Sequence, residues 1–338
     1  MEAYAGLDLH GDNVYCGISD ENDKRLFEKR FPCSIEGISN ALESYRDCLK
    51  GVAVESTFNW YWLVDGLKER NFPVRLASPS GMEQYNGLKH GNDKSDSFFL
   101  AKMMRLGILP EGYIYPKEER GVRDLLRRRM RLVQTQSGRI LSLEALWNRE
   151  TGKELSSNAA KILTKEDIEE ALNDKHVQMS AKQMIELVSF LSKQIKDLEK
   201  LVLKLANLKT EFNGLLTVDG IGKILAMTIV METGDIRRFP SPGDYASYCR
   251  AVNSELSSNG KKKGKGNTKN GNRYLAWAYV EAANFMIRYC PKAKAYFQRK
   301  MARTLRVVAI KSLAAKIAKA CFFIMRDGVS YDVKKMFG

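Results

Sequence analysis

Acidic residues stand at four positions where an apolar stretch ends or a helix is expected to begin: Asp8, Glu55, Asp93 and Asp96. The first lies near the end of the apolar run 3–9, and the second ends the run 51–55. Runs of this length are typical of buried strands, where an ionised carboxylate is rarely placed without a partner. The last two are three residues apart, so they share one helix face. Brought together, the four carboxylates would form a metal site.

Such a site could cleave phosphodiesters. Carboxylate oxygens are hard ligands suited to Mg²⁺ or Mn²⁺, and two such ions can activate a nucleophile and stabilise the leaving oxygen. For Asp93 and Asp96 the alternative is a helix cap, because D-x-x-D is also a capping pattern. Alone, the pair favours the cap, but Asp8 and Glu55 at two strand ends favour metal. We therefore predict that all four acids are catalytic and bind Mg²⁺ or Mn²⁺.

The elements that must position these acids are predicted within residues 1–115. After the first strand at 3–9, periodicity predicts strands and helices in the order 13–19, 24–31, helix 35–45, 52–55, helix 60–70 and 74–77. Three strands in close succession suggest an antiparallel meander. The whole order fits an α/β RNase H-like core, in which acids at the ends of the first and fourth strands face each other.

Composition favours a polyanionic partner. The net charge is +15 and the pI about 9.4, which indicates nucleic acid first and an anionic membrane surface second. No basic-then-apolar leader opens the chain, and no window approaches the ~18 apolar residues of a membrane span. The six cysteines form no C-x-x-C pair, which argues against a thiolate zinc site. We expect a cytoplasmic, nucleoid-associated protein with reduced, buried thiols and no membrane contact.

Residues 116–207 are predicted to form a basic helical and coiled-coil segment. Seven arginines and three acids lie between residues 118 and 139. A charge run is usually a solvated helix face, but this excess of arginine favours a nucleic-acid surface. The predicted contacts are Arg123, Arg127, Arg128 and Arg131.

Within the same segment, apolar residues recur at alternating steps of four and three: Met184, Val188, Leu191, Ile195, Leu198, Val202 and Leu205. This is an a/d seam over three heptads. Two interpretations stay open, an intramolecular helix hairpin and a coiled coil between protomers, because a two-position seam is narrow. The second predicts a homodimer, or a tetramer built from two dimers.

Residues 208–338 are predicted to be mainly helical, with two features that suit nucleic acid. The tripeptide G-I-G at 220–222 is typical of a helix-hairpin-helix turn, in which Gly220, Gly222 and Lys223 would approach a phosphate. The segment 257–267 predicts a flexible cationic loop that follows a phosphate backbone, with a disordered surface loop as the alternative. The predicted contacts in and after this loop are Lys261, Lys262, Lys263, Lys265, Lys269 and Arg273.

Several motifs resemble the IS110-type transposases, recombinases whose N-terminal domain is RuvC-like with a D-E-D-D acid set. They are G-L-D-L-H at 6–10, V-E-S-T at 54–57 and N-D-K-S-D-S-F-F-L-A at 92–101, then V-D-G-I-G at 218–222, G-D-I-R-R-F at 234–239, S-E-L-S-S-N-G-K-K-K at 254–263 and T-K-N-G-N-R-Y-L at 268–275. Only 151–179 carries none of the likeness. The sequence departs from the family at Gly11, Phe58 and 251–254, none of them a catalytic position.

The resemblance implies that Asp8, Glu55, Asp93 and Asp96 are the acid set and that Ser258 is the nucleophile, with Ser257 one register away. It implies recombination of DNA through a covalent serine–DNA link, guided by a structured noncoding RNA that the element encodes. A serine hydroxyl needs a base or a metal, and no histidine is near Ser258 in sequence, so the acid–metal set is the expected activator.

Two other functions stay open: a metal-dependent, RuvC-like structure-selective endonuclease that uses water, and a non-catalytic nucleic-acid-binding protein. Under the leading interpretation, Ser258 stands on a flexible loop in a different domain from the acids. Its own neighbours cannot hold it in attack geometry. We therefore expect Ser258 to lie far from the acids in the free protein, on a poorly ordered loop. The active site would be completed in the DNA complex and shared between subunits.

Overall fold

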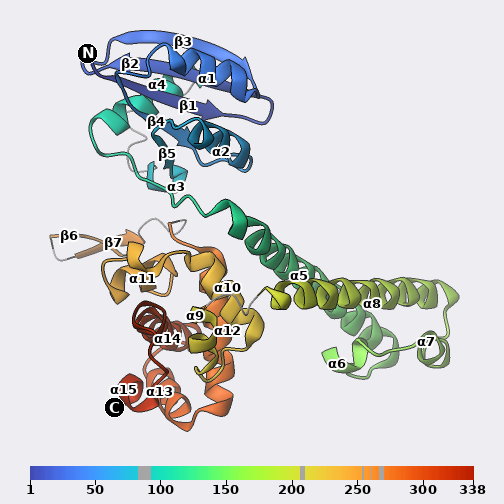
Figure 1. The fold of residues 1–338 in the computed structure, drawn as a ribbon. Helices are drawn as coiled ribbons and strands as arrows, with labels where there is room; N and C mark the ends of the chain where they lie inside the picture. Colours follow the sequence, from blue (N-terminus) through green and yellow to red (C-terminus); the bar gives the residue numbers. More distant parts are fainter. Residues whose placement is uncertain (83–92, 206–209, 253–254, 260, 266–269) are drawn as a thin grey trace. The chain divides into compact units, whose positions relative to one another are not determined.

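The computed structural model describes residues 1–338 except 83–92, 206–209, 253–254, 260 and 266–269 (Figure 1). The chain divides into two compact units, Met1–Lys117 and Glu118–Gly338. The first is an α/β unit, and the second, where described, is helical apart from one β-hairpin. The second unit includes both segments that the sequence analysis separates at residue 207.

The first unit is built on a five-stranded sheet of order β3-β2-β1-β4-β5. Its strands are β1 (Ala3–Leu9), β2 (Asn13–Asp20), β3 (Arg25–Pro32), β4 (Leu49–Glu55) and β5 (Val74–Ala77). The first three are antiparallel, whereas β4 lies parallel to both β1 and β5. This confirms the predicted α/β RNase H-like arrangement and the predicted order of strands and helices.

Apolar side chains fill one face of this sheet. Leu7 on β1 and Val54 on β4 are fully buried there. They pack in one cluster with residues of α1 (Ile35–Glu43) and α2 (Tyr61–Glu69). Ser34 begins α1 by accepting a 3.4 Å hydrogen bond from the backbone N–H of Gly37, as an N-cap residue does.

The opposite face lies under α4 (Asp93–Arg105) and is called the glycine face because it includes Gly6, Gly17 and Gly51. A Cβ at Gly6 would lie 1.8 Å from the carbonyl oxygen of Ser97, and a Cβ at Gly51 would lie 2.6 Å from the sulfur of Met104. Gly6 therefore excludes any side chain, because the neighbouring atoms belong to the backbone of α4, whereas at Gly51 the flexible Met104 side chain could move aside. Helix α4 thus lies directly against β1 and also packs on β4. The unit also contains the short helix α3 (Pro79–Met82).

The second unit contains these further elements: α5 (Lys117–Thr151), α6 (Ser157–Ala160), α7 (Lys165–Ala171), α8 (Lys175–Lys204), α9 (Thr210–Leu216), α10 (Lys223–Thr233), η3 (Ile236–Arg238), α11 (Pro242–Tyr248), β6 (Glu255–Ser258), β7 (Lys261–Lys265), α12 (Arg273–Tyr289), α13 (Pro291–Met301), α14 (Arg306–Asp327) and α15 (Val333–Phe337). Helices α6, α7 and α13 lie in segments that were predicted to be helical, but they were not predicted individually. Among the residues described, none of the helices has both the length and the apolar character that crossing a bilayer requires.

The long helices α5 and α8 lie side by side (Figure 1). Gln136 on α5 donates hydrogen bonds to the carbonyl of Val188 (3.1 Å) and to Ser192 (2.6 Å) on α8. The predicted seam is largely used within the chain, since Val188, Leu191 and Ile195 are at most 8% exposed. The intramolecular hairpin is therefore the better interpretation of the seam, and the expectation of a protomer–protomer coiled coil through it needs correction.

The remaining helices of the unit enclose a second core. Tyr245 on α11, Tyr279 on α12 and Phe322 on α14 are fully buried in it. The hydroxyl of Tyr245 lies 2.7 Å from that of Tyr279 and 2.8 Å from Oγ1 of Thr233. Burial of polar hydroxyls is tolerated here because each has a hydrogen-bond partner.

Candidate active site

Asp8 and Glu55 lie at the same edge of the sheet. Leu7 and Val54 are register partners in the parallel pair β1–β4, so the acids that follow them are neighbours. Side chains alternate across a strand, which places Asp8 on the face of Gly6, under α4. Both strands thus bring a carboxyl to the glycine face, as the sequence predicted for the ends of the first and fourth strands.

Asp96 approaches this pair from α4, and the effect of its charge on the pKa of Asp8 shows that the two side chains are close. Burial raises the pKa of Asp8 to about 7, the charge of His10 opposes the rise, and a hydrogen bond with Glu55 and the charges of Glu55 and Asp96 add to it. Asp8 is 3% exposed. A neighbouring negative charge raises the pKa of a carboxyl only at close range. Asp8, Glu55 and Asp96, three of the four predicted acids, therefore lie near one another and form the acid cluster.

Asp93 is the first residue of α4, and only its backbone is described. The prediction that its carboxylate completes the cluster therefore stays a prediction. Among the described residues no group of three or more His, Cys, Asp or Glu is arranged to hold a metal ion. The side chain of Asp93, the fourth expected ligand, is not among the described parts of the chain.

The local chemistry nevertheless fits a cation. Oδ2 of Asp8 is buried and has no hydrogen bond among the described residues, and Nε2 of His10 lies 3.2 Å from it. A buried carboxylate beside two other acids is costly unless positive charge compensates it. His10 was not among the predicted site residues, although its place directly after β1, two residues from Asp8, was a signal that could have identified it.

Ser258 lies in the second unit, at the end of β6. Its register partner is Lys261 in the antiparallel strand β7. The expectation of a flexible loop at 257–267 is wrong for the part that is described, because β6 and β7 form a hairpin with Asn259 at φ 51°. The side chain of Ser258 is not described, so the nucleophile and its register relative to Ser257 stay predictions.

The structure describes the side chains of only some of the hairpin lysines. Lys261 and Lys263 are exposed, as a phosphate contact requires. For Lys262 and Lys265 only the backbone, within β7, is described, and Lys269 lies outside the described residues. Arg273, the first residue of α12, is exposed and donates a 3.0 Å hydrogen bond to the hydroxyl of Tyr274.

The base of the hairpin is tied to the helical core. Arg250 donates to the carbonyl oxygens of Asn270 (2.9 Å) and Gly271 (3.1 Å). The backbone N–H of Asn272 donates a 2.6 Å hydrogen bond to the carbonyl of Tyr248. These bonds join the two ends of the segment that contains Ser258, so the hairpin leaves the helical body from a fixed base.

Two of the predicted nucleic-acid contacts have an internal partner instead. Arg123 is 7% exposed and its Nε lies 3.1 Å from Oε2 of Glu232, which corrects its assignment to a nucleic-acid surface. Arg127 donates to both carboxyl oxygens of the same Glu232, at 2.5 and 2.7 Å. Arg128 and Arg131 are exposed on α5, so the basic face is narrower than the sequence indicated.

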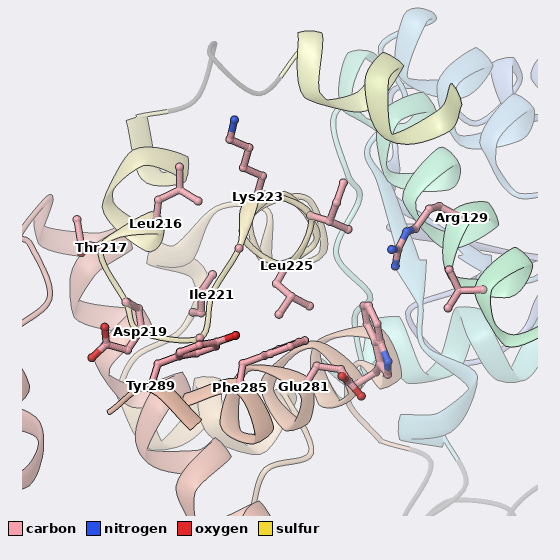
Figure 2. Close-up of a pocket in the computed structure, with 16 residues that line it drawn as sticks. Arg129, Leu216, Thr217, Asp219, Ile221, Lys223, Leu225, Glu281, Phe285 and Tyr289 are labelled. Atoms are coloured by element: carbon pink, nitrogen blue, oxygen red, sulfur yellow. The ribbon is translucent and has the colours of Figure 1, made fainter. Parts of the chain in front are cut away.

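The G-I-G turn joins α9 to α10, as predicted. Gly220 has φ 86°, and a Cβ there would lie 2.5 Å from the carbonyl oxygen of Ala282 on α12. Gly222 is the N-cap residue of α10, and Lys223, its first residue, is exposed. The turn borders a cavity of about 760 Å³, shown in Figure 2.

Comparisons with known proteins agree with these features. The IS110 DEDD transposase model matches residues 5–148, and the model of the transposase IS116/IS110/IS902 family matches residues 213–298. A protein named as a family 20 transposase of Pseudomonas aeruginosa is 24% identical over 247 residues, 71% of this chain and 72% of that one. The transposase for insertion sequence element IS1111A of Coxiella burnetii is 22% identical over 292 residues, 84% of this chain and 78% of that one.

Among solved structures, Thermus thermophilus RuvC in complex with a Holliday junction substrate aligns over 33% of this chain and 100% of its own. The identity is 15% and the TM-score 0.26. The two transposase models, by contrast, match successive parts of the chain, the first over the sheet with its acids and the second over the G-I-G turn and the serine hairpin. The protein belongs to the IS110 family of transposases.

Proposed function

We propose that this transposase cuts and rejoins DNA with Ser258 as nucleophile and with Asp8, Glu55, Asp93 and Asp96 as ligands of Mg²⁺ or Mn²⁺. The observation that supports the proposal is the cluster of Asp8, Glu55 and Asp96 at one sheet edge. When bound, a divalent ion supplies positive charge for the phosphate and for the leaving oxygen. The chain's own residues hold the ion and place the serine.

The chemical step exchanges one ester for another. Oγ of Ser258 attacks the phosphorus, an Oγ–P bond forms as one P–O bond of the DNA breaks, and the serine proton passes to a base. The released DNA oxygen takes up a proton, and attack by a DNA hydroxyl on the serine ester reverses the exchange on a new partner strand. Exposed Lys261 and Lys263 in the same hairpin would offset charge that builds on the phosphate.

A guide RNA and a homo-oligomer complete the proposal. The guide RNA follows from the family resemblance. The net charge of +15 and the exposed Arg128 and Arg131 provide a basic surface to which RNA and DNA could bind. The acids and the serine belong to different units of the chain. An oligomer, a dimer or a tetramer of two dimers, would let the acids of one subunit serve the serine of another.

The test is a search for a protein–DNA adduct. Wild-type protein incubated with element-end DNA, guide RNA and Mg²⁺, then denatured, is expected to retain covalently bound DNA, whereas Ser258→Ala is expected to retain none. Ser257→Ala is the matched control, because it alters the adjacent hydroxyl. Cleavage by Ser258→Ala without an adduct would favour the second candidate, a metal-dependent structure-selective endonuclease that uses water, which the same acid cluster supports.

A further inference from the structure

One face of α12 lines the cavity beside the G-I-G turn (Figure 2). The residues of α12 that line it recur at steps of four: Trp277, Glu281, Phe285 and Tyr289. Such residues lie on one helix face. Phe285 is 38% exposed and Tyr289 is 69% exposed. Two aromatic rings thus stand at the cavity with much of their surface open to solvent, and neither belongs to the buried core.

The facing wall is the turn itself, and it is rigidly placed. Val218 and Ile221 are 2% and 4% exposed, so they anchor the turn in the core. Gly220 packs against the backbone of α12, where a Cβ would lie 2.5 Å from the Ala282 carbonyl oxygen and 2.6 Å from the Met286 nitrogen. The cavity is therefore bounded by two elements whose separation is fixed, which suits a preformed binding site.

The cavity combines both charges with its aromatic rings. Lys223 is exposed and lines the cavity on the turn side, and Arg129 lines it from α5, where its guanidinium pairs with Glu199. The carboxyls of Asp219 and Glu281 also line the cavity. A ligand that satisfies all three chemistries carries an anion, a flat ring system and hydrogen-bond donors. A nucleotide has these three parts in its phosphate, its base and its exocyclic amine.

We propose that this cavity binds an unpaired nucleotide of the DNA substrate, with its base against Phe285 and Tyr289 and its phosphate beside Lys223. Glu281 accepts a hydrogen bond from the base amine, as carboxylates do from cytosine N4. The proposal rests on the proposed action on DNA, which is why DNA and not RNA is the assigned strand. A base inside a duplex is stacked on both sides, so only an unpaired or extruded base offers a face to these rings.

The experiment measures binding of full-length protein to a short single-stranded DNA that contains 2-aminopurine, and to the matching blunt duplex. Phe285→Ala and Tyr289→Ala are each expected to bind the single strand about tenfold more weakly, since base–aromatic stacking has about that effect. Duplex affinity is expected to stay within twofold of wild type, on the order of measurement error. Tyr289→Phe keeps the ring and is expected to keep wild-type affinity and fluorescence quenching.

Phe190→Ala is the matched control, because this aromatic side chain is 58% exposed on α8, outside the cavity. It is expected to bind both DNAs as wild type does. Wild-type single-strand affinity in both cavity variants would overturn the proposal, and so would an equal loss for the duplex. Binding of a single-stranded RNA of the same sequence, with no measurable binding of the DNA, would overturn the assignment to DNA. Binding needs no strand exchange, so a failure of the serine chemistry leaves this readout unchanged.

Discussion

Nδ2 of Asn272 donates a 2.7 Å hydrogen bond to Oε2 of Glu232, and Oδ1 of the same asparagine accepts from the backbone N–H groups of Tyr274 and Leu275. One side chain thus caps α12 and contacts a carboxylate that is fully buried. Arg123 and Arg127 of α5 bind that carboxylate as well. The buried acid therefore joins α5, α10 and the segment that follows the serine hairpin.

The first prediction is that Glu232→Gln destabilises the second unit by about 3–5 kcal/mol, because it leaves buried arginine charge without its counter-ion. The measurement is the free energy of unfolding in denaturant. Glu186→Gln is the control, since Glu186 pairs with Lys165 at a site where both side chains are more than half exposed, and such pairs contribute about 0–1 kcal/mol. Equal, small losses in the two variants would contradict the structural role of Glu232.

The same acid gives a pH dependence. Burial raises the pKa of Glu232, but the hydrogen bonds and charges of Arg127 and Arg123, with Asn272, outweigh burial and lower it below 4.5. The stabilisation is therefore fully present above pH 4.5 and is lost as the pH falls through the lower, folded-state pKa. Wild-type protein is expected to lose more stability than Glu232→Gln in this acid window, which thermal unfolding at stepped pH would measure.

A second prediction concerns the acid cluster. Asp8→Asn is expected to abolish DNA cleavage while folding and DNA binding stay close to wild type, because the amide has nearly the same shape but cannot supply the charge that holds a divalent ion. Cleavage, thermal unfolding and duplex affinity are measured on one preparation. Asp65→Asn is the control, because Asp65 lies on α2 and is not part of the acid cluster. Retained cleavage by Asp8→Asn would remove this carboxylate from the chemistry.

The third prediction tests whether the apolar seam of α8 stabilises the single chain or joins two protomers. Leu191 is 5% exposed within one chain, so Leu191→Ala is expected to cost about 2–5 kcal/mol of unfolding free energy. Leu187 on the same helix is 39% exposed, and Leu187→Ala is expected to cost much less. Light scattering should give both variants the wild-type mass. A shift of Leu191→Ala to monomer, at unchanged stability, would restore the coiled coil between protomers.

Salt dependence is the subject of the fourth prediction. With about six phosphate contacts, affinity should fall about a thousandfold between 50 and 200 mM salt. Arg128→Gln and Arg131→Gln are each expected to reduce the slope of log affinity against log salt by about one. Arg123→Gln is expected to lower stability and leave the slope unchanged, because its guanidinium is bonded to Glu232. A flat salt response would mean that the basic faces only solubilise the protein.

Mixing of subunits provides the fifth prediction. Asp8→Asn and Ser258→Ala are each expected to be inactive, and their mixture is expected to recover part of the strand exchange if acids and serine come from different subunits. The assay is product formation after co-incubation with DNA and guide RNA. An inactive mixture, from variants that are shown to co-assemble, would indicate that each subunit uses its own serine.

Local patterns predicted the first unit well. Alternation and apolar runs gave all strands of the sheet in order, and parallel neighbours β1 and β4 then bring Asp8 and Glu55 together. The partner of a charge was not predictable in this way. Arg123 was assigned to a nucleic-acid surface because local periodicity cannot predict its pairing with Glu232, which lies more than a hundred residues later in the chain. The hairpin at 255–265 was missed for a related reason, since glycine and lysine carry little strand propensity.

The close packing of α4 on Gly6 determines how long a side chain an acid on α4 needs in order to reach the sheet. A carboxyl on aspartate extends one methylene less than a carboxyl on glutamate, so an aspartate on α4 needs the helix to lie close to the strands. Because Gly6 lets the backbone of α4 approach the backbone of β1, the shorter acid suffices, and fewer bonds are free to rotate. The dimensions of the acid cluster are thus set in part by Gly6, a position that contributes no side chain to it.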